Sequence, residues 1–103
     1  MLIVTTDAIP GKNIEALGFV QGSVVQGKHI GKDILAGFKN MAGGEIRTYT
    51  DLLNTSQAIA QERMVESAKN LGADAIVCVR IASCSIVPGT SEVRMFGTAV
   101  KFI

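Results

Sequence analysis

The chain has 103 residues, enough for a single domain over residues 1–103, and its ten basic and nine acidic residues leave a formal net charge of +1. No basic stripe is present, and one tyrosine with four phenylalanines offers few platforms for base stacking, so nucleic-acid binding is not expected. The longest apolar run, Ala75 to Val79, is far shorter than the ~20 residues of a membrane-spanning helix, which also argues against a membrane protein.

Apolar residues are unusually abundant for so short a chain, since 48% are hydrophobic and only 18% are charged. A small domain covers its apolar surface poorly, and soluble monomers rarely leave such a surplus exposed. We therefore expect a homo-oligomer that buries the surplus between subunits. The start of the chain, Met1 to Asp7, lacks the features of a signal peptide, so we expect a cytoplasmic protein whose cysteines are free thiols.

The first predicted elements are two strands. Leu2 to Thr5 is β-prone and is followed by a turn signal at Ile9-Pro10-Gly11. Ala16 to Gln26 is the second strand, and one of its faces carries Gly18, Val20, Gly22 and Val24. Alternating glycines on a strand face indicate that something approaches the backbone closely there. A helix and a neighbouring subunit are both compatible with this pattern.

Two helices follow in the prediction. Apolar residues at helical spacing span Ile30 to Met41, and Gly43-Gly44 ends that segment. Thr48 to Asp51 resembles a capping box, which begins an amphipathic helix from Tyr49 to Leu71 that Gly72 ends. This helix would be roughly 35 Å long, and we expect it to overhang its own sheet and meet a partner.

Strands return after the helices. Ala75 to Ile86 is a strand, Val87 to Ser91 a hairpin loop, and Glu92 to Phe102 the last strand. The predicted order is β-β-α-α-β-β, an α+β fold with a mainly antiparallel sheet and helices packed on one face.

Five segments of the chain carry a family resemblance: Thr5-Thr6, Lys32 to Glu45, Tyr49 to Leu53, Leu71 to Val77 and Gly97 to Val100. Together they resemble the YbjQ-like family of small bacterial proteins, which carries the label of a heavy-metal-binding domain. The similarity covers essentially the whole chain and implies a compact α+β subunit assembled into a ring, typically a pentamer. It implies no settled activity. Family members usually have a small residue such as glycine where this chain has Cys78.

Candidate metal ligands are Cys84, Cys78 and His29, and the ion they would favour is a soft one such as zinc or copper. The two cysteines share a predicted strand face with Ile76, Arg80 and Ala82. Six residues of strand separate them by about 20 Å, too far for one ion to bridge within a subunit. Cys78 is best read as a small buried hydrophobe, whereas Cys84 lies near the polar strand end and is the better accessible thiol. His29 has no ligand partner at close spacing and would need the fold or a ring to supply one.

The remaining candidates have structural interpretations as well. Gly43-Gly44-Glu45 fits a tight helix–helix connection better than an anion site. Arg63 and Arg80 stand among apolar residues, which predicts pairing with a carboxylate, and the candidates are Glu45, Asp51, Glu66 and Asp74. An anion site in a ring is the functional alternative.

No catalytic constellation is visible in one chain, so we do not expect an enzyme, although a ring could assemble a site from several chains. Two functions remain open. The first is a homo-oligomer that binds a small ligand or a soft metal. The second is a structural ring that presents a surface to another protein and holds no small molecule.

Overall fold

The structure, a computed structural model, describes residues 1–26, 47–84 and 90–103 of the chain. The α+β class is confirmed: the described part holds one helix and a four-stranded sheet. The predicted helix from Ile30 to Met41 lies outside the described residues. In chain order the elements are β1 (Leu2–Ile3), β2 (Ile14–Gln26), α2 (Arg47–Asn70), β3 (Ala75–Cys84) and β4 (Ser91–Phe102).

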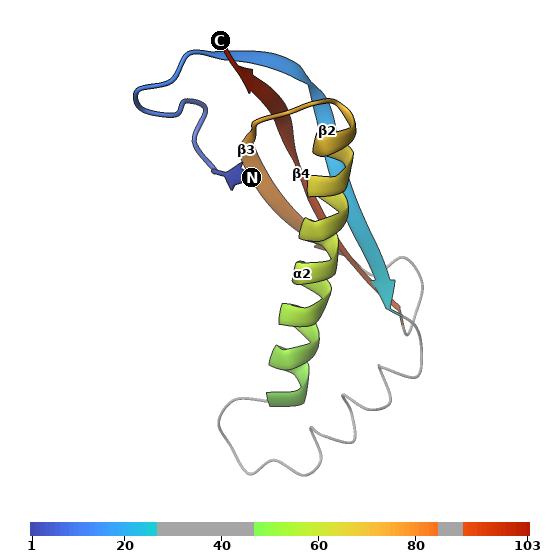
Figure 1. The fold of residues 1–103 in the computed structure, drawn as a ribbon. Helices are drawn as coiled ribbons and strands as arrows, with labels where there is room; N and C mark the ends of the chain where they lie inside the picture. The colour runs from blue at the N-terminus through green and yellow to red at the C-terminus, as the bar shows by residue number, and fades with distance from the viewer. Residues whose placement is uncertain (27–46, 85–89) are drawn as a thin grey trace.

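The strands are ordered β1-β3-β4-β2 across the sheet (Figure 1). β4 is antiparallel to both β2 and β3, as the prediction of a mainly antiparallel sheet requires. The short β1 is the exception, because it runs parallel to β3 and makes the sheet mixed. Beyond Val79, the outer edge of β3 has no strand partner within the described residues, since β1 pairs only with Ala75 and Ile76.

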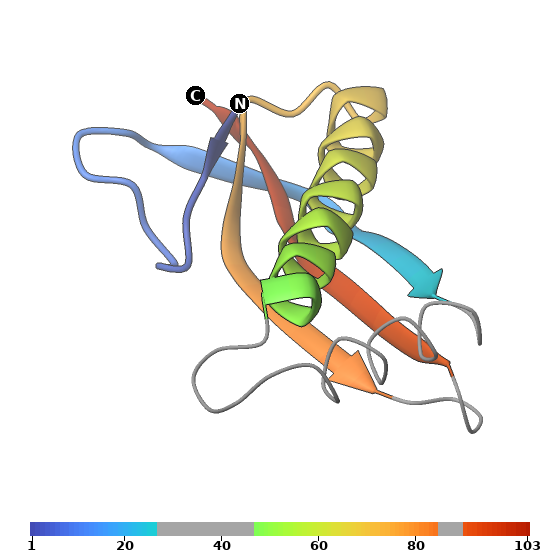
Figure 2. The same cartoon turned by 90° about the horizontal axis from the view of Figure 1, so that it is seen from below.

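One face of the sheet is covered by α2, which packs mainly on β2 and β4 and leaves most of β3 bare (Figure 2). The buried positions of α2 recur every four residues at Ser56, Ala60, Met64 and Ala68. Three of these side chains are small, so the helix can approach the sheet closely. A Cβ atom on Gly22 of β2 would overlap backbone atoms of Ala60 and Met64. The close neighbour of the glycine face is therefore α2.

The end of α2 follows the prediction closely. Gly72 has φ +77°, and the N–H groups of Ala73 and Gly72 donate to the carbonyls of Ala68 (3.1 Å) and Lys69 (2.9 Å), the pattern of a Schellman cap. The start differs slightly, because the helix begins at Arg47 and Thr48 lies inside its first turn. No side chain from Thr50 to Thr55 is buried, so the helix does overhang the sheet within this chain.

Among the described residues, the segment after β1 covers one end of the opposite face of the sheet. The segment after β1 turns at Ile9 to Lys12, with Gly11 at φ +78° and the Lys12 N–H donating to the Ile9 carbonyl (3.1 Å). This turn carries Ile9 onto Ala75, Val77 and Val100, which form a second small core. The other end of the same face, toward Cys84 on β3, is left without such a cover in the described part of the chain.

A β-bulge in β3 changes which residues share a face. The register with β4 shifts between Val77 and Arg80, and Cys78 has φ +55°, a left-handed conformation that favours glycine. Ile76 packs in the core beneath α2, whereas Arg80 pairs with Phe96, whose side chain lies on the opposite face. The prediction that Ile76 shares a face with Arg80, Ala82 and Cys84 is therefore wrong, because the bulge adds one residue to the alternation.

Candidate functional site

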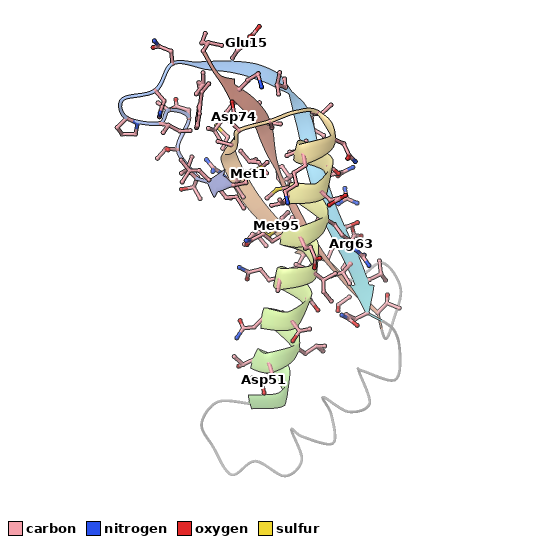
Figure 3. The ribbon with its side chains drawn as sticks, in the orientation of Figure 1. Met1, Glu15, Asp51, Arg63, Asp74 and Met95 are labelled. Atoms are coloured by element: carbon pink, nitrogen blue, oxygen red, sulfur yellow. The ribbon has the colours of Figure 1, made fainter. Side chains whose placement is uncertain are left out.

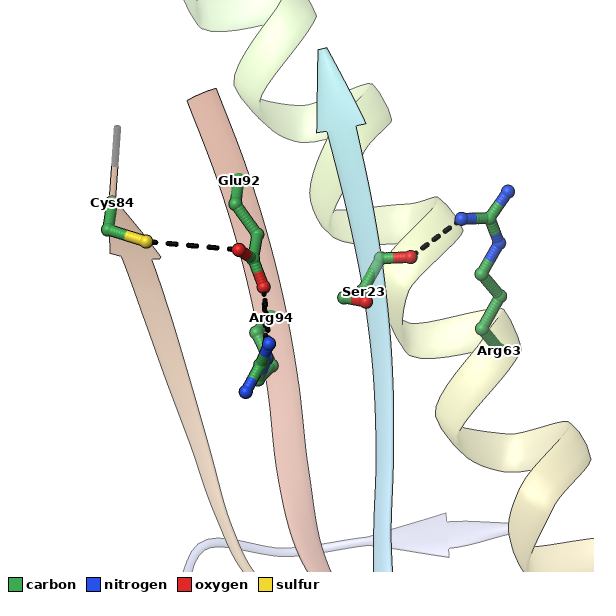
Figure 4. Close-up of polar contacts among 5 residues, drawn as sticks. All are labelled: Ser23, Arg63, Cys84, Glu92 and Arg94. Carbon is green, nitrogen blue, oxygen red and sulfur yellow. Dashed lines mark hydrogen bonds and ion pairs between the residues drawn. The ribbon is translucent and has the colours of Figure 1, made fainter. Parts of the chain in front are cut away.

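The face of the sheet opposite α2 carries a small polar cluster at the end of β3 and the start of β4 (Figure 4). Cys84 and Glu92 are cross-strand partners in the hairpin register, and the Cys84 thiol donates to Oε2 of Glu92 over 3.9 Å. Arg94 follows two residues later on the same face. A pocket of about 170 Å³ is lined by Ala82, Ser83, Cys84, Glu92 and Arg94.

Glu92 is only 8% exposed, and Arg94 is its ion-pair partner. The Arg94 guanidinium donates from Nη2 (2.7 Å) and Nε (3.0 Å) to the same oxygen, Oε1, of Glu92. Burying a carboxylate destabilises the folded state unless the group has an ion-pair partner and hydrogen bonds. Arg94 supplies the opposite charge and two hydrogen-bond donors. Oε2 is left facing Cys84, so thiol and carboxylate are presented together to the pocket.

Cys84 and Glu92 offer a sulfur and an oxygen ligand, which is a donor set that zinc accepts. A structural zinc site has four ligands. Within residues 1–26, 47–84 and 90–103, no three His, Cys, Asp or Glu side chains come close enough to hold one ion. The thiolate and carboxylate pair fits zinc in kind, but the described residues of a single chain do not complete the site.

The two predicted cysteine ligands lie at different places on β3. Cys84 is exposed at the end of β3, whereas Cys78 is half-buried at the bulge and packs against the second core. Cys78 therefore serves as a small hydrophobe, as its sequence context indicates. His29 falls outside the residues that the structure describes.

Glu92 is the residue that sequence reasoning missed. The predicted hairpin already contained the information needed to find Glu92. A hairpin brings the last residues of its first strand opposite the first residues of its second strand. Applying that symmetry to the strand ends would have placed Glu92 near Cys84. Only the observed register pairs the two residues directly.

The two arginines singled out in the sequence bind main-chain carbonyls of the described residues. Arg63 donates from Nη1 to the Ser23 carbonyl (2.6 Å), and Arg80 donates from Nη1 to the carbonyls of Thr5 (2.9 Å) and Val79 (2.8 Å). Arg63 extends from α2 over the outer edge of β2, and it satisfies a carbonyl on the side of that strand where no other strand lies within the described residues (Figure 4). Within the described residues of one chain, neither arginine forms an ion pair with Asp51, Glu66 or Asp74, and a pairing between subunits stays a prediction.

None of the described segments contains a helix with the length and apolar character needed to cross a bilayer.

Comparison with known proteins gives full-length matches. Residues 1–103 match a protein family described as "Putative heavy-metal-binding". A "UPF0145 protein" of Vibrio parahaemolyticus is 55% identical over 104 residues, covering 100% of this chain and 99% of the relative. A "UPF0145 protein" of Alkaliphilus metalliredigens is 50% identical over 103 residues, with 100% of both chains covered.

A solved structure from Pediococcus pentosaceus, described as a protein of unknown function in the DUF74 family, has the same fold. Its TM-score is 0.69 at 15% identity, with 100% of this chain and 98% of that chain covered.

Proposed function

The chain belongs to the YbjQ-like family described as "Putative heavy-metal-binding", and on that premise we propose that it is a cytoplasmic homo-oligomer, a pentamer, that binds a soft metal ion. The observation that carries the proposal is the pairing of the exposed Cys84 thiol with Oε2 of Glu92 at 3.9 Å in a pocket. Zinc and copper(I) are the ions whose ligand preferences suit a thiolate.

An oligomer explains why the ligand set of one subunit is small. Two side chains of the described part converge, so the remaining ligands come from water, from a neighbouring subunit, or from His29, the single histidine of the chain. A closed ring repeats such a composite site once per interface. The metal stoichiometry should therefore equal the number of subunits.

The test is native mass spectrometry of protein purified without chelator, before and after addition of zinc or copper(I). We expect one ion per subunit in the wild type, and loss of the ion in Cys84→Ser and in Glu92→Gln. Cys78→Ser is the matched control, because it removes a thiol that lies away from the pocket and should bind metal as the wild type does. His29→Ala tests whether the histidine completes the site.

Wild-type binding in Cys84→Ser, or loss of binding in Cys78→Ser as well, would overturn this assignment of the ligands. A ring that takes up neither metal would overturn the metal-binding function itself.

A specific observation favours the second candidate, a ring that presents a surface to another protein. Phe19 remains 64% exposed and lies beside the ring of Phe96, with ring centroids 6.2 Å apart, so two aromatic side chains meet on one face of the sheet. Aromatic side chains are enriched in protein–protein interfaces. An apo ring that ignores both metals and retains a protein partner through mild purification would support this function over metal binding.

A further inference from the structure

Arg94 bonds to the two carboxylate oxygens of Glu92 unequally. Its guanidinium donates from both Nε (3.0 Å) and Nη2 (2.7 Å) to Oε1. An arginine and a carboxylate frequently form two parallel hydrogen bonds, one to each oxygen. Here both donors converge on Oε1, and Oε2 is the oxygen that faces the Cys84 thiol (Figure 4). One oxygen of Glu92 thus carries the ion pair, and the other is presented to the pocket.

The register of the sheet explains how Arg94 reaches Glu92. The two residues are two positions apart on β4, so their side chains leave the same face of the strand. The cross-strand neighbours of Arg94 are Ala82 on β3 and Ser23 on β2, and both have small side chains. They leave room for the guanidinium to turn along β4 toward the carboxylate. Because Arg94 is exposed and Glu92 is buried, the carboxylate is the inner member of the pair.

The separation of Cys84 and Glu92 suits two ligands of one ion. Sγ and Oε2 are 3.9 Å apart. Zinc binds a thiolate sulfur at about 2.3 Å and a carboxylate oxygen at about 2.1 Å, so two such ligands at a tetrahedral angle lie about 3.6 Å from each other. The observed separation is close to that value. Oε2 is therefore already placed to share an ion with the Cys84 sulfur.

The pocket depends on Glu92 for its carboxylate. Of the described residues that line the pocket, Glu92 is the only acidic one. The acidic residues labelled in Figure 3 lie elsewhere: Glu15 and Asp74 are at the end of the sheet where β4 finishes, and Asp51 is on the overhanging part of α2. How tightly the described residues hold an ion therefore depends on how well this one carboxylate is oriented.

We propose that Arg94 is a positioning residue for metal binding, which holds Glu92 so that Oε2 is offered to the ion beside the Cys84 sulfur. The inference rests on the metal-binding function proposed above and names the residue that prepares the site.

Two effects of Arg94 on metal affinity oppose each other. Hydrogen bonds to a metal ligand orient it and typically strengthen binding by about 10–100-fold. The positive charge of the guanidinium repels a divalent ion and weakens binding. We expect orientation to dominate, because Arg94 bonds to Oε1 rather than to Oε2 and its charge is exposed to solvent, which screens it.

The test measures zinc affinity by competition with a chromophoric chelator in the wild type, Arg94→Ala and Arg94→Lys. Arg94→Ala removes the hydrogen bonds and the charge together, whereas Arg94→Lys keeps the charge and loses the planar pair of donors. We expect both variants to bind zinc about 10–100-fold more weakly than the wild type. Titrations are made at a temperature at which circular dichroism shows every variant to be folded.

Arg80→Ala is the matched control. Arg80 lies on the same face of the sheet as Arg94, but its guanidinium donates to the carbonyls of Thr5 and Val79. The control therefore removes the same charge and the same type of side chain without touching Glu92. It should bind zinc as the wild type does.

Cobalt(II) in place of zinc gives a spectroscopic measurement that a general loss of stability would not change. The charge-transfer absorption of a cobalt–thiolate bond reports Cys84, and the visible ligand-field bands report the arrangement of all the ligands. At saturating cobalt, we expect the Arg94 variants to keep the charge-transfer absorption, because Cys84 is still a ligand. Their ligand-field bands should differ from those of the wild type, because Glu92 is no longer held in one orientation.

The outcomes separate this inference from the proposed function. A wild type that binds neither zinc nor cobalt would refute metal binding, and the role of Arg94 with it. Unchanged or tighter zinc binding in Arg94→Ala would leave metal binding in place and overturn the positioning role. Wild-type affinity in Arg94→Lys would show that charge alone is sufficient, which also overturns it. Loss of the cobalt–thiolate absorption in the folded Arg94 variants would show that the substitution acts on Cys84 rather than through Glu92.

Discussion

Gly22 sets how closely α2 can lie on the sheet, and Gly22→Ala is the sharpest test of this packing. A Cβ atom at position 22 would overlap the Ala60 carbonyl oxygen and the Met64 nitrogen, and would lie 2.9 Å from the Arg63 carbonyl carbon. All three are backbone atoms, so no side-chain rotation relieves the overlap. The helix would have to lift away from β2.

The expected loss of stability is the difference between two opposing effects. Alanine is intrinsically better than glycine inside a strand by about 0.5–1 kcal/mol, which favours the variant. Overpacking costs about 1–3 kcal/mol, and lifting α2 also loosens Met64, whose burial is worth about 1.5–3 kcal/mol. We therefore expect a net decrease of about 2–3 kcal/mol in the free energy of unfolding. For a chain of this length, that lowers the midpoint of thermal unfolding by about 10–20 °C.

The assay is urea unfolding followed by far-ultraviolet circular dichroism, at one protein concentration because association would contribute to stability. Gln21→Ala is the matched control, since Gln21 is the preceding residue of β2 and its side chain is exposed on the other face. The control should stay within about 0.5 kcal/mol of the wild type. A Gly22→Ala variant as stable as the wild type, or more stable, would refute the close packing of α2 on β2.

Two further predictions concern β3 and β4. Cys78→Gly should be more stable than Cys78→Val by about 1–2 kcal/mol in thermal unfolding. The reason is that φ at this position is +55°, a backbone conformation that β-branched residues tolerate least. Equal stabilities of the two variants would contradict that conformation. Arg94→Ala should lower the free energy of unfolding by about 1–3 kcal/mol by leaving the carboxylate of Glu92 unpaired, and adding Glu92→Gln should restore most of it. If the double variant recovers nothing, the ion pair is not the source of the loss.

The candidate site was only partly predictable. Cys84 could be singled out as the accessible thiol because polar neighbours mark the end of its strand. Its pairing with Glu92 depends on the register of β3 with β4. A shift of that register by one residue would place a different residue opposite Cys84. The carbonyl partners of Arg63 and Arg80 come from β2 and from the chain after β1, and no local pattern identifies them.

The sequence by itself determined the features that depend on neighbouring residues. The turn at Gly11, the C-terminal cap at Gly72 and the strand and helix segments follow from backbone preferences and hydrophobic period, which act over a few residues. Only the tertiary structure decided the bulge at Cys78, the pairing of Cys84 with Glu92 and the choice of α2 as the neighbour of Gly22. These depend on how distant segments pack together, and several packings satisfy the same local preferences.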